Sequence, residues 1–222
     1  ASTSPDSSIR NLAWSADGLI LAYQLGGIHL YDTQTEEDRL LIADNPANDF
    51  SFRSYWPVSF SPDGSQLAAI VGMYEAHGWA IVDTRTGSAS EAAAPYTLMT
   101  TWSQSGIAFY IASDHAQEMM GFPPGLLRIA PGMSGLYTEY LIDNQAIWAP
   151  YAHGDTLLYF LSGSQGLTLY RSGADGVSGR VALWNHPYLF GQDGIDSFAW
   201  TPDGSYVALG LPPHASDVLN DV

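Results

Sequence analysis

The side chains best suited to chemistry lie in the polar stretch of residues 114–120. His115 and Glu118 are three residues apart there, so one helical turn would bring both to the same face, where they could bind a metal ion. Two ligands in one stretch are a weak signal, because a protein site for a metal such as zinc supplies at least three. We therefore interpret the stretch as a solvated loop and predict no metal site in it.

Three aspartates each lie directly before a glycine and two residues after a Ser or Thr: Asp17, Asp63 and Asp203. They could be ligands or catalytic carboxylates, but Asp in a short polar turn commonly accepts hydrogen bonds from nearby backbone, so we predict a structural role. The chain has no Cys, which excludes disulfides and thiolate chemistry. It contains neither a Gly-x-Ser-x-Gly nor a His-Glu-x-x-His motif. We predict no catalytic, cofactor-binding or metal-binding residue, although a glycosidase carboxylate pair has no recognisable pattern in one sequence.

These aspartates belong to a repeated segment. Its clearest copy, residues 57–71, has two apolar, β-prone runs joined by a Ser-Pro-Asp-Gly turn, which predicts a β-hairpin with a glycine of positive φ. Five copies follow one another, the third with Ser105 in place of Asp and the fourth degenerate. Their turn glycines are 42–50 residues apart: Gly18, Gly64, Gly106, Gly154 and Gly204.

Each of the first four hairpins is followed by a third apolar run, a polar turn and a weaker fourth run, of which residues 88–94 are Ala-rich and poorly β-prone. Four short strands per repeat are typical of the blades of a β-propeller, which stack because each blade has two apolar faces. One aromatic position recurs in every copy, and we predict that it packs between blades rather than forming a carbohydrate-stacking stripe. Its residues are Trp14, Phe60, Trp102, Trp148 and Trp200.

The Trp-Ser-Pro-Asp-Gly-like motif, followed by a strand with Ala and an aromatic residue, resembles the WD40-like (PD40) repeat of TolB-type propellers over residues 9–210. The second and fifth copies match well, the first has Ala16 in place of Pro, and the third and fourth depart at the Asp. The resemblance implies a rigid platform for interactions, in the bacterial cell envelope or attached to an enzyme.

The expected fold class is all-β, a β-propeller of four-stranded blades with about five repeats. Residues 1–8 are expected to be a polar linker, 9–210 the propeller, and 211–222 a tail or partial blade. Only 12 residues follow Gly210 in the fifth copy, too few for a full blade. Two of them are prolines, which cannot donate the backbone hydrogen bonds of a sheet. Because an open stack would expose apolar faces and strand edges, we hypothesise a longer propeller or a partner chain that closes it.

The composition is that of a folded, acidic chain, with 46% hydrophobic residues, 14% charged residues and a formal net charge of −16. This charge argues against nucleic acid and anionic membrane surfaces as partners, and no apolar run approaches the roughly 18 residues of a membrane span. We expect a protein partner or further blades of the same protein, with an oligomer possible, and no cofactor. The expected location is the periplasm, the cell surface or the medium.

Three irregular segments, residues 44–55, 112–125 and 185–196, are candidate contact loops, because loops of about a dozen residues often carry function. The candidate partner contacts are Phe50, Phe52, Tyr55, His115, Phe122, Pro123, Tyr188 and Phe190. The favoured function is a non-enzymatic interaction or assembly module. The alternatives are the propeller portion of a larger hydrolase of the prolyl oligopeptidase type, and a propeller enzyme or lectin that binds a glycan in its channel.

Overall fold

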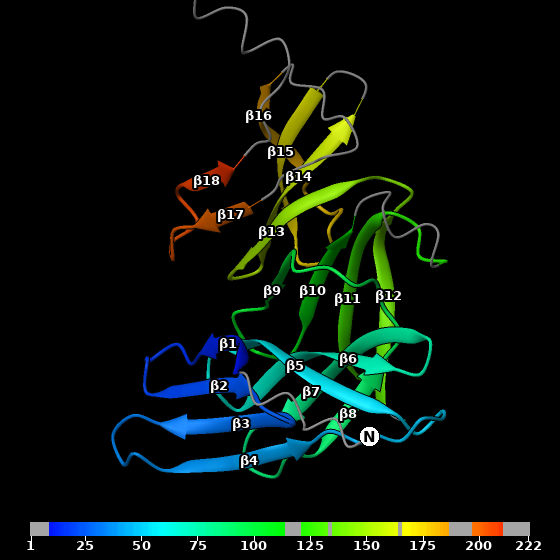
Figure 1. Ribbon diagram of the computed structural model, residues 1–222. Coiled ribbons are helices and arrows are strands. Elements are labelled where there is room, and N and C mark those ends of the chain that lie inside the picture. Colours follow the sequence, from blue (N-terminus) through cyan, green and yellow to red (C-terminus); the bar gives the residue numbers. More distant parts are fainter. Residues whose placement is uncertain (1–8, 114–120, 133–134, 164–165, 187–196, 211–222) are drawn as a thin grey trace, which may run out of the picture. The chain divides into compact units, whose positions relative to one another are not determined.

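The computed structural model describes residues 9–113, 121–132, 135–163, 166–186 and 197–210, and every regular element in these ranges is a β-strand (Figure 1). In the same ranges, no helix is long and apolar enough to cross a membrane. The chain divides into two compact units. The first unit comprises Ala1–Leu98, Trp102–Phe109 and Arg128–Glu139, and the second comprises Met99–Thr101, Tyr110–Leu127 and Tyr140–Val222.

Two four-stranded antiparallel sheets belong wholly to the first unit, and each has its strands in chain order. The first sheet consists of β1 (Arg10–Trp14), β2 (Ile20–Gln24), β3 (Gly27–Asp32) and β4 (Asp38–Ala43). The second consists of β5 (Arg53–Phe60), β6 (Gln66–Met73), β7 (Ala76–Asp83) and β8 (Ala89–Ala92). The Ala-rich run is therefore a strand, as predicted, because pairing with β7 outweighs its low β-propensity.

The remaining sheets repeat this plan. The third has the order β12-β11-β10-β9 and contributes to both units, while the fourth (β13 to β16) and the two-stranded fifth belong to the second unit. The strands are β9 (Thr100–Trp102), β10 (Phe109–Ser113), β11 (Gly125–Gly132), β12 (Gly135–Asp143), β13 (Ile147–His153), β14 (Thr156–Gly163), β15 (Gly166–Gly173), β16 (Val181–His186), β17 (Ser197–Trp200) and β18 (Val207–Gly210). The predicted all-β class and four-stranded sheets are confirmed.

The hairpin turns have the predicted conformation. All five turn glycines have positive φ, between 57° and 72°. In the second copy the N–H of Gly64 donates to the carbonyl of Ser61 at 2.9 Å. The hydroxyl of Ser61 donates to Asp63 Oδ1 at 2.7 Å and accepts the N–H of Gln66 at 2.9 Å. The turn thus depends on a Ser–Asp pair, which confirms the structural role of the aspartate.

The fourth copy has a different turn. His153 pairs with Thr156, so only Gly154 and Asp155 lie between the paired residues, whereas six residues separate the paired Phe60 and Leu67 of the second copy. The register also shifts between Trp148 and Tyr151. This copy therefore lacks the Ser–Asp pair, which explains why its sequence is degenerate.

The recurring aromatic position packs between sheets in all copies but one. Trp102 is 8% exposed and its Nε1 donates to the carbonyl of Ser59 at 3.2 Å, while Trp200 Nε1 donates to the carbonyl of Ala149 at 3.0 Å. Phe60 and Trp148 are also buried. Trp14, in contrast, is 54% exposed, so the packing prediction is wrong there.

The first two sheets share a hydrophobic cluster that includes Ile28, Leu30, Phe60 and Leu67. On the other face of the second sheet, Trp79 is fully buried, donates from Nε1 to the carbonyl of Pro95 at 2.8 Å and contacts the ring of Phe109 at a centroid distance of 5.0 Å. In the second unit, Trp148, Phe160 and Leu167 form the centre of another cluster. Both units therefore have a core of their own.

The turn aspartates predict a fold that weakens in acid. Hydrogen bonds from serine or threonine hydroxyls and from backbone N–H groups hold the pKa of Asp17, Asp63 and Asp203 below the ordinary value of 3.8. Such a carboxylate stabilises the folded state above its ordinary pKa, and this contribution is lost as the pH falls below about 4. We expect the urea midpoint to fall between about pH 5 and pH 2.5.

The source of that loss can be tested with freshly purified Asp63→Asn, whose carboxamide oxygen still accepts hydrogen bonds but does not titrate. Its urea midpoint should depend less on pH than that of the wild type. Glu75→Gln removes one negative charge outside these turns and is the matched control. If Asp63→Asn and the wild type lost stability equally in acid, the explanation would be wrong.

Candidate functional site

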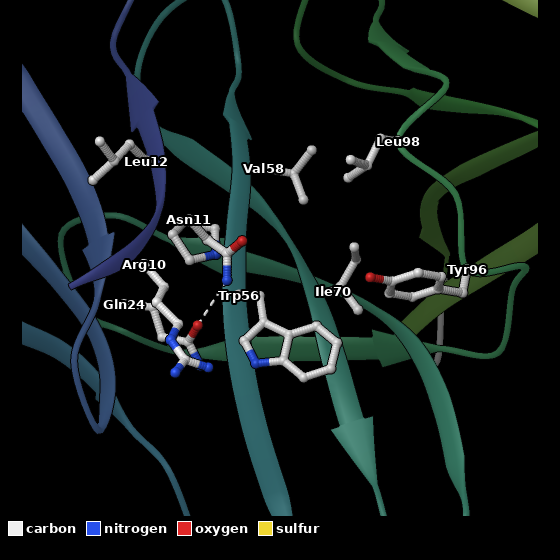
Figure 2. Close-up of a pocket in the computed structure, with 10 residues that line it drawn as sticks. Arg10, Asn11, Leu12, Gln24, Trp56, Val58, Ile70, Tyr96 and Leu98 are labelled. Atoms are coloured by element: carbon white, nitrogen blue, oxygen red, sulfur yellow. Dashed lines mark hydrogen bonds between the residues drawn. The ribbon is translucent and has the colours of Figure 1, made fainter. Parts of the chain in front are cut away.

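A hollow of about 710 Å³ lies in the first unit where β1 and β5 contact each other (Figure 2). We call it the β1–β5 hollow. Its volume falls in the range of roughly 300–1,000 Å³ that is typical of small-ligand sites. It is lined by Arg10, Asn11, Leu12, Gln24, Trp56, Pro57, Val58, Ile70, Tyr96 and Leu98.

Both strands that form the hollow are irregular at this point. The register of β1 against β2 shifts between Arg10 and Leu12, and Asn11 has a φ of 46° there. The register of β5 against β6 shifts between Pro57 and Ser59. A bulge adds a residue to one strand, bends it and re-aims its side chains, and Asn tolerates the left-handed conformation better than most residues. The two bulges therefore shape the wall of the hollow.

The polar wall is held by a chain of hydrogen bonds. Asn11 Nδ2 donates to Gln24 Oε1 at 2.7 Å, and Gln24 Nε2 donates to Ser54 Oγ at 3.5 Å. Ser54 Oγ in turn donates to Asp44 Oδ2 at 3.3 Å, while Asp44 Oδ1 accepts the backbone N–H of Tyr55 at 2.9 Å. Burial raises the pKa of the Asp44 carboxyl above its ordinary value. The hydrogen bonds to Ser54 and Asp44 thus orient the carboxamides of Asn11 and Gln24.

The opposite wall is aromatic. Trp56 and Tyr96 have ring centroids 6.2 Å apart and ring planes at 89°, so they form a corner. His77 supports both rings, at 5.6 Å from Trp56 and 5.3 Å from Tyr96. Tyr96 is 43% exposed. Figure 2 shows Trp56 between the polar side chains of Arg10, Asn11 and Gln24 and the ring of Tyr96.

These groups are suited to binding. The guanidinium of Arg10 offers only hydrogen-bond donors, while each carboxamide offers donors and an acceptor. The aromatic walls offer apolar faces with a negative electrostatic potential. The exposed side chains of Leu12 and Leu98 add aliphatic surface at the rim. The hollow can therefore hold a ligand that has both polar groups and a flat apolar face.

A second hollow, of about 690 Å³, lies in the same unit and is lined by acidic residues, among them Asp17, Asp32 and Asp63. These carboxylates already accept hydrogen bonds within their own turns. Within the described ranges, no group of three or more His, Asp or Glu side chains is placed to hold a metal ion. The β1–β5 hollow is the better candidate because it combines carboxamide groups with an exposed aromatic corner.

The predicted contact residues in the first loop segment differ in exposure. Phe50 is 83% exposed and its ring meets Tyr74 edge-on at a centroid distance of 5.4 Å. Phe52 is half-buried. Tyr55 lies in β5 and is 7% exposed, and its hydroxyl donates to Glu91 Oε1 at 3.0 Å. Burial and this carboxylate raise the pKa of Tyr55 to about 12. Phe50 thus offers a contact surface, whereas Tyr55 supports the fold.

The other predicted contacts lie in different parts of the chain. Phe122 and Pro123 are half-buried in the second unit, where the carbonyl of Pro123 accepts a hydrogen bond from the hydroxyl of Ser113 at 3.4 Å. His115, Tyr188 and Phe190 lie outside the described residues. Their role as partner contacts stays a prediction.

Sequence reasoning missed every residue of the β1–β5 hollow. Trp56 and Arg10 precede the repeated hairpin motif by a few positions, and the motif drew attention to the turn instead. Asn11 could have indicated the bulge in β1, because Asn tolerates left-handed backbone and lies here inside an otherwise β-prone run. Two bulged strands from different repeats create the site, and only the fold brings them together.

Comparisons with known proteins give a match in structure only. No family model matches the sequence, and no curated protein matches it. A protein assigned as TolB from Agrobacterium tumefaciens is 16% identical with a TM-score of 0.55, over 91% of this chain and 74% of that chain. An oligogalacturonate lyase from Vibrio parahaemolyticus is 15% identical with a TM-score of 0.55, over 93% of this chain and 60% of that chain.

A third similar structure is the β-propeller domain of the Trilobed protease from Pyrococcus furiosus, which is described as having an open velcro topology. It is 12% identical with a TM-score of 0.52, over 82% of this chain and 59% of that chain. This chain therefore spans less than two thirds of the lyase and of the protease domain. Identities this low show the fold alone. The chain is an all-β protein whose successive four-stranded sheets match those of β-propellers, TolB-like proteins among them.

Proposed function

We propose that this chain is a non-enzymatic β-propeller interaction module of the cell envelope or the cell exterior. The observation that carries the proposal is the β1–β5 hollow, which has the volume of a ligand site and joins oriented hydrogen-bonding groups to an exposed aromatic corner. The structural likeness to a TolB-type protein supports the propeller fold of this module.

A second contact surface belongs to the same proposal. Trp14 exposes an indole at the position where Trp102 and Trp200 donate to the carbonyl of another sheet. We propose that a protein partner, or further blades of the same protein, covers this face of the first sheet. Such a partner would give Trp14 the packing that the other repeats have.

The alternative is the propeller portion of a larger hydrolase of the prolyl oligopeptidase type. It is favoured by the likeness to the propeller domain of the Trilobed protease. In such a protein the hollow would face a substrate or a catalytic domain rather than a separate partner.

Site-specific photo-crosslinking in the native cells tests the proposal. A photoreactive residue at Leu98, which lines the hollow, and one at Trp14 should each capture a partner. Ile107 is the matched control, because it is 66% exposed while Leu98 is 67% exposed, and both lie in the first unit outside its core. The proposal is contradicted if positions 98 and 107 give the same products, or if neither 98 nor 14 gives any. Capture at 98 of a catalytic domain would favour the hydrolase alternative.

A further inference from the structure

We infer that the β1–β5 hollow binds a saccharide, with a sugar ring against the corner of Tyr96 and Trp56 and sugar hydroxyls on Asn11 and Gln24. The inference rests on the proposed function and names the class of ligand that the module recognises. It is carried by the geometry of the two walls and by the shape of the strand edges between them.

The aromatic corner suits a pyranose ring. A sugar has one face that is mainly C–H groups, and an aromatic face attracts such partly positive edges. Tyr96 keeps 43% of its surface exposed, and Trp56 meets it at 89° instead of covering its face. His77 packs against both rings and holds them in place. The corner therefore offers two rigid aromatic surfaces, and a ligand can stack on them without first displacing a side chain.

The polar wall suits hydroxyl groups. A hydroxyl both donates and accepts, and so does a carboxamide, so Asn11 and Gln24 can each pair with a diol. Their mutual hydrogen bond at 2.7 Å and the links through Ser54 to the half-buried Asp44 fix their orientation before a ligand arrives. Such preorganisation lowers the entropic cost of binding. Arg10, in the same wall, adds the donors that a carboxylated sugar would use.

The strand edges argue against an extended peptide as the ligand. β1 and β5 are edge strands, and a peptide that adds a strand needs a regular row of free N–H and C=O groups. The bulge at Asn11 interrupts that row in β1, and the shift between Pro57 and Ser59 interrupts it in β5. Pro57 also has no N–H to donate. This surface therefore favours a ligand that is bound by side chains rather than by the strand backbone.

A glycan array with neutral and uronic oligosaccharides, followed by calorimetry with each hit, tests the inference on the intact chain. We expect binding by wild type and about tenfold weaker binding by Tyr96→Ala, since loss of one aromatic stack corresponds to about 1.4 kcal/mol. Tyr96→Phe should bind within about twofold of wild type, because it keeps the ring. Tyr206→Ala, which removes a 74% exposed tyrosine of the second unit, is the matched control and should change affinity by less than about twofold.

The outcomes separate the two proposals. An array without hits, together with a protein captured specifically at Leu98, would overturn the saccharide inference and leave the interaction module standing. An array without hits and no specific capture at either Leu98 or Trp14 would overturn both. Equal losses in Tyr96→Ala and Tyr206→Ala would also overturn the saccharide site. If the hits are uronic glycans and their affinity falls as salt is added, the carboxylate is assigned to Arg10. If the hits are neutral glycans and their affinity is independent of salt, binding is assigned to the carboxamides and the aromatic rings.

Discussion

Replacing Trp79 with alanine is expected to lower the free energy of unfolding of the first unit by about 3–5 kcal/mol. The side chain is fully buried, packs against Phe109 and donates to the carbonyl of Pro95 at 2.8 Å. The substitution leaves a large cavity and also a carbonyl without its donor, and each effect is costly on its own. Guanidinium unfolding followed by circular dichroism measures the change as a lower midpoint.

Trp14→Ala is the matched control, because it removes the same side chain from a position that is 54% exposed. We expect it to cost less than about 1 kcal/mol, as most surface substitutions do. If the two variants unfolded at the same denaturant concentration, the assignment of Trp79 to the core and of Trp14 to the surface would be wrong.

Gly87→Ala is expected to cost about 2–5 kcal/mol. Gly87 has a φ of 74°, and a Cβ built on it would lie 2.0 Å from the carbonyl oxygen of Leu41 in β4. The turn between β7 and β8 therefore approaches the first sheet so closely that only glycine fits. Alanine would combine the cost of a left-handed L-residue, about 1–2 kcal/mol, with the strain of pushing two backbone segments apart, about 1–3 kcal/mol.

Gly64→Ala separates the two contributions. Gly64 has almost the same φ, 72°, but no atom lies within 4 Å of its would-be Cβ. This variant should therefore show only the conformational cost, about 1–2 kcal/mol, when both are compared by urea unfolding. Equal losses in Gly64→Ala and Gly87→Ala would show that the approach to Leu41 is looser than the structure has it.

The turns and strands were predictable because their causes are local. A Ser-Pro-Asp-Gly segment determines its own turn, and Gly64 has the positive φ that this segment predicts. In the fourth copy Gly154 also lies in the hairpin turn with positive φ, as predicted. There the sequence around Trp148 was aligned with the motif, yet the strands are joined by a two-residue turn at Gly154. A degenerate motif therefore does not predict the length of its turn or the position of a register shift in its strands.

The candidate site was not predictable, because its causes are non-local. Trp56 and Tyr55 are neighbours in a run of aromatic residues, but β5 turns one toward the hollow and the other into the core. The alternation of a strand separates them, and which face is buried depends on the sheet that packs there. Sequence alone assigned Tyr55 to the contact surface and passed over Trp56, because it could not identify the buried face.

The order of the strands has a consequence for how the chain is made. Each sheet has its strands in chain order, so each is built from one continuous stretch of residues. During synthesis, a sheet can complete its internal hydrogen bonds as soon as that stretch has left the ribosome, before the next one exists. Contacts that are close in sequence also form quickly, since short loops are easy to close. A nascent chain of this kind completes its backbone hydrogen bonds sheet by sheet, so few strand edges wait for residues that have not yet been made.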